Sequence, residues 1–200
     1  MALYDYELAI VCQGNSSEPL SRTLGDDGLL VLSGRPGEAT LFGMSMFVDD
    51  FERDIDGAPL RATRLLFDAE PFEAFIRSRF ADLVAWLWNV AEAINPLTMF
   101  IPSGSDARSS SRPDALFADL PQLLASGAAA VAHPVVYFAE ALADGALCRP
   151  VENIAYYEVQ RAPGLGCLYL FVSRNEAGVD ILETGSLQRE MLAQLRSRRR

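Results

Sequence analysis

The alternation of apolar and polar residues predicts strands in the first third of the chain. Residues 3–12 (LYDYELAIVC) alternate well enough to form a strand, and the polar stretch 13–23 that follows indicates a loop. Residues 60–67 resume the strand pattern, with Arg61 on the outward face. The acidic run 49–57 before them is predicted to be a loop.

A β-hairpin is predicted between these segments. Its arms are residues 29–33 and 39–48, and Pro36 and Gly37 between them suit the two central positions of a type II turn. In the second arm, alternation places four apolar side chains on one face, namely Phe42, Met44, Met46 and Val48.

One long helix, about residues 70–95, follows the first strands. Pro71 lies near its first turn and Pro96 ends it. Trp86 falls on one shoulder of the apolar stripe, whereas Trp88 lies about 120° from the middle of the stripe, where it is either covered by another element or exposed. The stripe recurs at spacings of three and four through Phe72, Ile76, Phe80, Leu83, Val84, Leu87, Val90, Ala91 and Ile94.

The rest of the chain predicts more strands and some shorter helices. Residues 134–144 favour a helix, although Val135-Val-Tyr-Phe is also compatible with a strand. Strands are predicted over 97–101, 154–161, 167–174 and 179–183, the last three as a meander, and helices over 114–125 and from Ser186 onward.

Taken together, these elements predict an α+β fold. We expect a mostly antiparallel sheet of about six to eight strands, backed by the long helix and two or three shorter ones. The whole chain, residues 1–200, is predicted to be a single globular domain. Residues 102–113 are predicted to be a mobile serine-rich loop, and residues 196–200 a basic tail.

The residue inventory excludes several kinds of chemistry. The chain has seventeen arginines, no lysine and a single histidine, His133. Without lysine there is no Schiff base and no P-loop, and one histidine cannot supply a site that needs two imidazoles. The cysteines Cys12, Cys148 and Cys167 form no CxxC pair, which favours free thiols in a reducing cytoplasm. No cofactor and no bound metal are expected.

Negative charge is concentrated near the N-terminus. The net charge is −10, and residues 1–60 hold eleven acidic residues against three arginines. A body this acidic repels phosphate backbones, so we expect neither nucleic acid nor membrane as a partner. The run 49–57 imitates part of a calcium loop but lacks the bidentate glutamate at the twelfth position. We therefore interpret it as a docking surface, with the partner-binding residues Asp49, Asp50, Glu52, Asp54, Asp56 and Trp88.

These observations favour a non-catalytic domain that binds and neutralises a basic protein, as small bacterial immunity or inhibitor proteins do. The alternative is a small cytoplasmic enzyme in which residues 102–113 cover a carboxylate site or a Cys–His pair of Cys148 and His133. A third possibility is a small-ligand carrier with a cavity lined by Phe42, Met44 and Met46. The oligomeric state is left open.

Overall fold

The computed structural model describes five stretches of the chain, residues 6–14, 18–55, 57–101, 133–142 and 157–181. The chain divides into two compact units, Met1–Met99 and Phe100–Arg200. The described residues form mostly antiparallel strands with two helices, which confirms the predicted α+β class. The prediction of a single domain stays a prediction. The segments 102–113 and 196–200 lie outside the described residues.

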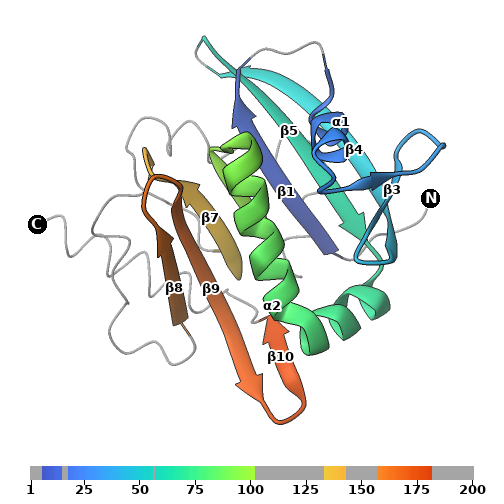
Figure 1. Ribbon diagram of the computed structural model, residues 1–200, viewed down its shortest axis with the longest axis vertical. Helices are drawn as coiled ribbons and strands as arrows, with labels where there is room; N and C mark the ends of the chain where they lie inside the picture. The colour runs from blue at the N-terminus through green and yellow to red at the C-terminus, as the bar shows by residue number, and fades with distance from the viewer. Residues whose placement is uncertain (1–5, 15–17, 56, 102–132, 143–156, 182–200) are drawn as a thin grey trace, which may run out of the picture. The chain divides into compact units, whose positions relative to one another are not determined.

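The first unit contains antiparallel strands in the order β1-β5-β4-β3-β2 (Figure 1). β1 pairs with β5 along its whole length, and β4 pairs with the other edge of β5. Another strand, β6 (Thr98–Ile101), begins at the end of this unit. The bounds of the five strands are Tyr6–Gln13 for β1, Val31–Leu32 for β2, Glu38–Leu41 for β3, Met44–Ile55 for β4 and Ala58–Phe67 for β5.

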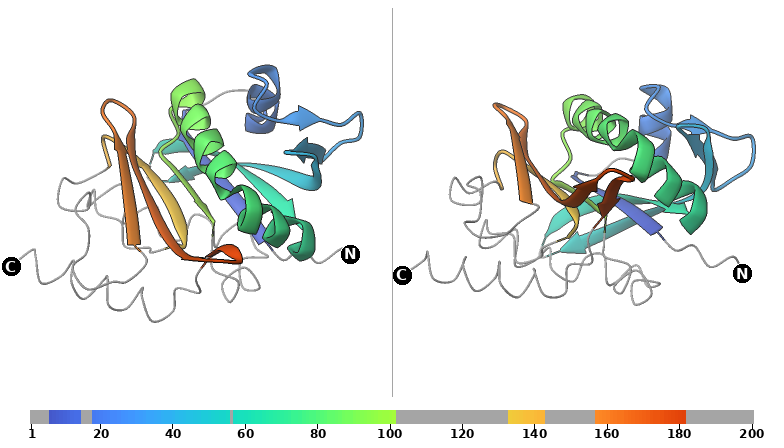
Figure 2. Two further views of the ribbon diagram at one scale, coloured as in Figure 1. Left: turned by 60° about the horizontal axis from the view of Figure 1, so that its bottom comes forward. Right: turned by 90° about the horizontal axis from the view of Figure 1, so that it is seen from below.

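The core of this unit lies between β1, β5 and the long helix α2 (Ala69–Ile94), which runs along β1 (Figures 1 and 2). Phe72 of α2 packs against the rings of Tyr6 and Phe67, with centroids 4.9 and 4.7 Å away. Leu8 and Leu65, which are register partners, are fully buried. The predicted helix is thus confirmed because its apolar stripe covers one face of the sheet.

Both ends of α2 agree with the prediction, whereas a kink in the middle of the helix was not predicted. At the C-terminal end, Asn95 adopts a left-handed conformation with φ 44° and Pro96 follows it, so the helix cannot continue. At Arg79 the backbone leaves helical geometry, with φ −134° and ψ 30°. No proline or glycine stands near this kink, so composition gave no signal for it.

The predicted type II turn is confirmed. Gly37 has φ 75°, and the amide of Glu38 donates to the carbonyl of Arg35, which are the two marks of this turn. The turn joins β2 to β3, which pair in antiparallel register.

The second arm of the hairpin, predicted as one strand over 39–48, is instead two strands. Phe42 and Gly43 have φ values of 54° and 84°, the positive pair that a two-residue type I′ turn requires, and they join β3 to β4. Phenylalanine is rare at such a position, because a left-handed backbone costs it about 1–2 kcal/mol. Its ring offsets this cost by stacking on Phe75 of α2, with centroids 4.5 Å apart.

The acidic run 49–57 is not a loop, which corrects the prediction. Residues through Ile55 belong to β4 and pair with β5, and the turn to β5 is made at Gly57. The alternation was hidden because acidic side chains occupy both faces of this strand. In addition, the stretch 13–23 is not all loop: helix α1 (Leu20–Asp26) begins within it and buries Leu20 and Leu24.

The second unit is built around β9 (Gly166–Asn175), which pairs antiparallel with three strands. The prediction of a helix over 134–144 is wrong, because Val135-Val-Tyr-Phe forms a fully buried strand, β7 (Val135–Ala139), whose residues have no exposed face to mark with polar side chains. The predicted meander is confirmed by β8 (Tyr157–Ala162), β9 and β10 (Gly178–Ile181). The helices predicted over 114–125 and from Ser186 lie outside the described residues.

The described strands number ten, more than the six to eight expected. The excess comes from the division of residues 39–48 into two strands and from the strand at 135–139.

Among the described glycines of the second unit, Gly166 leaves the least room for a side chain. Its φ is 151°, and a β-carbon there would lie 2.1 Å from the carbonyl oxygen of Phe138 on the neighbouring strand. We predict that Gly166→Ala lowers the free energy of unfolding by about 2–3 kcal/mol, measured by denaturant titration. The control is Gly164→Ala, at φ 81° with open space around it, which should lose only about 1 kcal/mol. Equal losses for the two variants would contradict the predicted clash.

Candidate functional site

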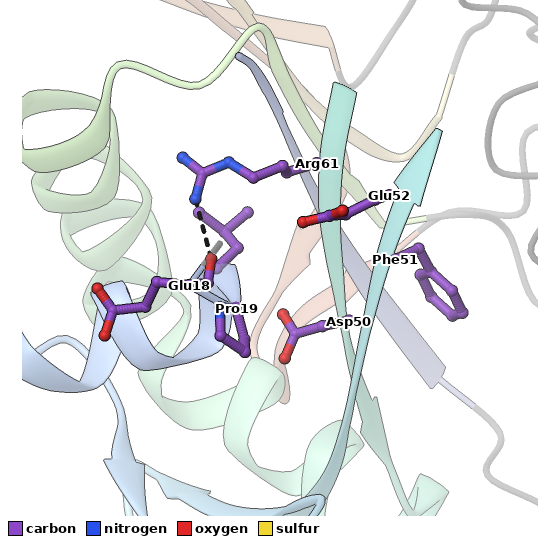
Figure 3. A pocket seen from close by; sticks show the side chains of 7 residues that line it. Glu18, Pro19, Asp50, Phe51, Glu52 and Arg61 are labelled. Atoms are coloured by element: carbon purple, nitrogen blue, oxygen red, sulfur yellow. Dashed lines mark hydrogen bonds between the residues drawn. The ribbon is translucent and has the colours of Figure 1, made fainter. Parts of the chain in front are cut away.

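The candidate site is the acidic end of β4, residues 49–55, together with the start of α1. Because strand side chains alternate, Asp50 and Glu52 point toward α1 while Phe51 points to the other side of the sheet (Figure 3). Asp50 and Glu52 lie opposite Thr63 and Arg61 of β5 in the register. The predicted acidic set is therefore divided between two faces.

Asp50 holds α1 against β4. One carboxylate oxygen accepts a hydrogen bond from the backbone amide of Ser21 at 3.0 Å, and the other accepts one from the Ser21 hydroxyl. Pro19 precedes the helix and supplies no side-chain cap, so Asp50 satisfies one of the first amides of α1 from a different element. This residue has a structural role in addition to any role in binding.

A small open pocket of about 210 Å³ lies beside this contact. Its polar wall consists of the carboxylates of Asp50 and Glu52, of Arg61, and of the backbone carbonyl of Glu18, which accepts a hydrogen bond from the Arg61 guanidinium at 3.2 Å (Figure 3). Glu52 is exposed and makes no hydrogen bond or ion pair with any described residue. The remaining lining comes from Pro19, Leu20 and Phe51.

Glu18, which sequence reasoning missed, is tied to a neighbouring arginine as well as to the pocket. Its carboxylate lies 3.1 Å from Arg22, one turn further along, and both side chains are largely exposed. Such a pair contributes little to stability. Nothing in the sequence links Glu18 to the run 49–57; only the antiparallel pairing of β4 with β5 and the placement of α1 bring it there.

The side chain of Asp49 lies on the opposite face of the sheet, where it pairs with Arg64. Arg64, which is 6% exposed, lies 2.8 Å from Asp49 and 3.9 Å from Glu7, which is 5% exposed. Its guanidinium also lies over the ring of Phe51, 4.6 Å from the centroid. This buried cluster compensates charges that would otherwise be costly to bury, so Asp49 has a structural function.

The other predicted partner-binding residues are dispersed. Asp54 accepts a hydrogen bond from the amide of Gly57 at 2.8 Å and so fixes the turn between β4 and β5. Asp56 lies outside the described residues. On α2, Trp86 is buried and its indole N–H donates to the carbonyl of Leu29, while Trp88 is half-buried. The role of these residues in binding a partner stays a prediction.

The residues of the alternative enzymatic site are only partly described. His133 stacks on Phe100, with ring centroids 4.4 Å apart and planes 11° from parallel. Cys148 lies outside the described residues, so the Cys–His pair stays untested. Within the described stretches, no three His, Cys, Asp or Glu side chains are grouped as metal ligands.

The described cysteines, Cys12 and Cys167, are free, as predicted, and both are buried. Burial raises the pKa of the Cys12 thiol to about 11, although the guanidinium of Arg61, its register partner, opposes this shift. Cys12 is therefore a neutral thiol at physiological pH and is not an activated nucleophile.

Comparisons with protein-family models, with curated proteins and with solved structures find no match for this chain. No helix among the described residues has the length and apolar character that crossing a membrane requires.

The contact between Asp50 and Ser21 predicts a difference between two neighbouring acids. Asp50→Ala should lower the free energy of unfolding by about 1–2 kcal/mol, because it leaves the amide and the largely buried hydroxyl of Ser21 without an acceptor. Glu52→Ala, two residues along on the same face, should change it by less than about 0.5 kcal/mol. Denaturant unfolding monitored by circular dichroism measures both, and a larger loss for Glu52→Ala would refute this assignment.

The raised pKa of Cys12 predicts a pH dependence of stability. The thiol ionises near 9 in the unfolded chain but near 11 in the folded one, so the unfolded state loses its proton first as the pH rises. Stability from this group is complete below pH 9 and is lost between about pH 9 and 11. At pH 10 the loss is about 1.4 kcal/mol.

This pH effect is isolated by comparing wild type with Cys12→Ala in urea at pH 8 and pH 10. The difference in unfolding free energy between the two proteins should shrink by about 1.4 kcal/mol at the higher pH. The pKa of Tyr137, raised by burial to about 12, affects both proteins equally. A difference independent of pH would show that Cys12 is not shielded from solvent.

Proposed function

We propose that this chain is a non-catalytic protein-binding domain of the immunity or inhibitor type, which binds a basic partner protein through the acidic end of β4. The observation that carries the proposal is the carboxylate of Glu52, exposed at the pocket and without an ion-pair partner among the described residues. Together with Asp50 it faces one guanidinium, that of Arg61, so the wall of the pocket has a net negative charge.

The chemistry of this pocket suits a single arginine or lysine side chain of the partner. The aliphatic stem of such a side chain can pack on Pro19 and Leu20, and its cationic head can reach the carboxylate of Glu52. A volume of about 210 Å³ has room for one side chain of this kind but is small for an ordinary organic ligand. The acidic field of the whole chain, with net charge −10, would speed the encounter with a basic protein.

The proposal is tested by neutralising the pocket without changing its shape. The pocket variant is Glu18→Gln/Glu52→Gln, which retains the contact between Asp50 and Ser21 that holds α1 against β4. A matched control, Glu70→Gln/Glu92→Gln, makes the same change in net charge on exposed positions of α2. Each immobilised protein is exposed to lysate of the cells that make it, bound proteins are identified by mass spectrometry, and their affinity is then measured with purified components.

We expect wild type and the control to retain the same basic protein, and the pocket variant to bind it about tenfold more weakly. The affinity of wild type should also fall as salt increases. Equal binding by the pocket variant and the control would refute the pocket as the site. Retention of no protein by wild type at low salt would refute the function itself.

A further inference from the structure

The two exposed large apolar residues of the described chain lie next to each other on β2. Val31 is 67% exposed and Leu32 is 43% exposed. As consecutive strand residues they point to opposite faces of the sheet, so β2 is open on both faces. β2 is also the last strand in the order of the first unit, and among the described strands it pairs with β3 alone. Its other edge is therefore available to an added strand.

The backbone groups on the free edge can be assigned from the ladder. The amide of Ser33 donates to the carbonyl of Glu38 on β3 at 3.0 Å. Because inward and outward groups alternate along an antiparallel strand, the N–H and C=O of Leu32 point away from β3. These are the groups that an incoming strand would bind.

The edge is held in place before any partner arrives. The amides of Leu29 and Leu30 both donate to the carbonyl of Leu24 at the end of α1, at 2.9 and 3.1 Å. The carbonyl of Leu29 in turn accepts from the buried indole of Trp86 at 2.7 Å. The chain thus enters β2 from a fixed point, which lowers the entropy lost when a strand is added.

The negative charges around β2 favour a basic segment, and disfavour a second copy of the chain, as the strand that binds there. Asp26 and Asp27 are exposed at the C-terminal end of α1, where the last carbonyls already carry partial negative charge and no basic residue stands in the last turn. The side chain of Leu32 contacts this end of the helix at Gly25. On β3, Glu38 is exposed and only loosely paired with Arg35, at 3.8 Å. A second copy of the chain would bring the same carboxylates together, so self-pairing is disfavoured.

We propose that β2 is the edge at which an extended segment of the basic partner adds as a strand, with arginine or lysine alternating with aliphatic residues. The backbone of the segment pairs with Leu32, and its aliphatic side chains cover Leu32 on one face of the sheet. Its cations lie on the opposite face, beside Val31 and toward Glu38, while Asp26 and Asp27 add to the negative field around the strand. This inference rests on the proposed function, because it takes the basic partner from it, but it concerns a different surface from the pocket at Glu52.

The test uses a short synthetic peptide in which arginine alternates with valine, and the same peptide with its valine amides N-methylated. The methyl groups remove backbone donors while keeping charge and side chains. Binding to the full chain is measured by calorimetry at low salt and at about 0.3 M salt. We expect the plain peptide to bind at least about tenfold more tightly than the methylated one, and more weakly in high salt.

Two variants locate the site. Leu32→Pro removes the outward N–H without removing a donor to β3, and should weaken the plain peptide about tenfold. Val31→Ser keeps the backbone and should weaken it less. Thermal melting shows whether each variant is folded. If Leu32→Pro does not fold, the comparison of the plain and methylated peptides and the effect of Val31→Ser still test the proposal. The pocket variant Glu18→Gln/Glu52→Gln should bind the peptide like wild type.

Equal binding of the two peptides would overturn strand addition, as would the absence of any binding at about 1 mM peptide. Sedimentation showing a dimer that Leu32→Pro dissociates would assign the edge to a second copy instead. If the pocket variant loses partner binding but no peptide binds at β2, the inference about β2 is refuted and the proposed pocket is not. If the peptide binds at β2 but the pocket variant binds the partner as tightly as wild type does, only the pocket is refuted.

Discussion

The first unit depends on the burial of the aromatic face of α2 against β1 and β5. Phe72 lies between the rings of Tyr6 and Phe67, and beneath them the side chains of Leu8 and Leu65 are fully removed from water. The apolar area buried there is the main source of stability for the unit. It also fixes the register of the sheet, because a shift of one residue would turn the side chains that α2 covers to the opposite face of the sheet.

That register determines how the acidic end of β4 is used. With Val48 opposite Leu65 in the core, Asp50 and Glu52 must emerge on the side of α1, and Asp49 must emerge on the side of Arg64. Two of these three carboxylates are engaged by Ser21 and Arg64, which leaves Glu52 as the carboxylate with no role in the fold. The described acids of this run, which look uniform in the sequence, are thus divided by geometry into members that hold the fold together and Glu52, which has no such partner.

The sequence predicts those parts of the fold whose signals are local. The stripe and proline boundaries of α2, the type II turn at Pro36 and Gly37, and the C-terminal meander all agree with the structure. The failures have physical causes in tertiary contacts. β7 is buried on both faces and shows no alternation. The turn at Phe42 and Gly43 has a glycine only at its second position, and phenylalanine stands at the first position, where asparagine, aspartate or glycine is usual.

The candidate site was predictable only in part. Abundance of acids pointed to residues 49–56, but their pairing with β5 and the contribution of Glu18 and Arg61 depend on long-range placement that no spacing in the sequence reveals. Likewise, the exposure of Val31 and Leu32 is invisible to a method that expects apolar residues of a strand to face the core.

The turn at Phe42 and Gly43 has a consequence for the order of folding. A hairpin closed by a favourable turn can form early from local interactions alone. Here the left-handed phenylalanine is stabilised by Phe75, which is far away along the chain and becomes positioned only when α2 docks. We therefore expect the junction of β3 and β4 to form late, after the helix and sheet have come together. Changes at Phe42 should then alter the unfolding rate more than the folding rate.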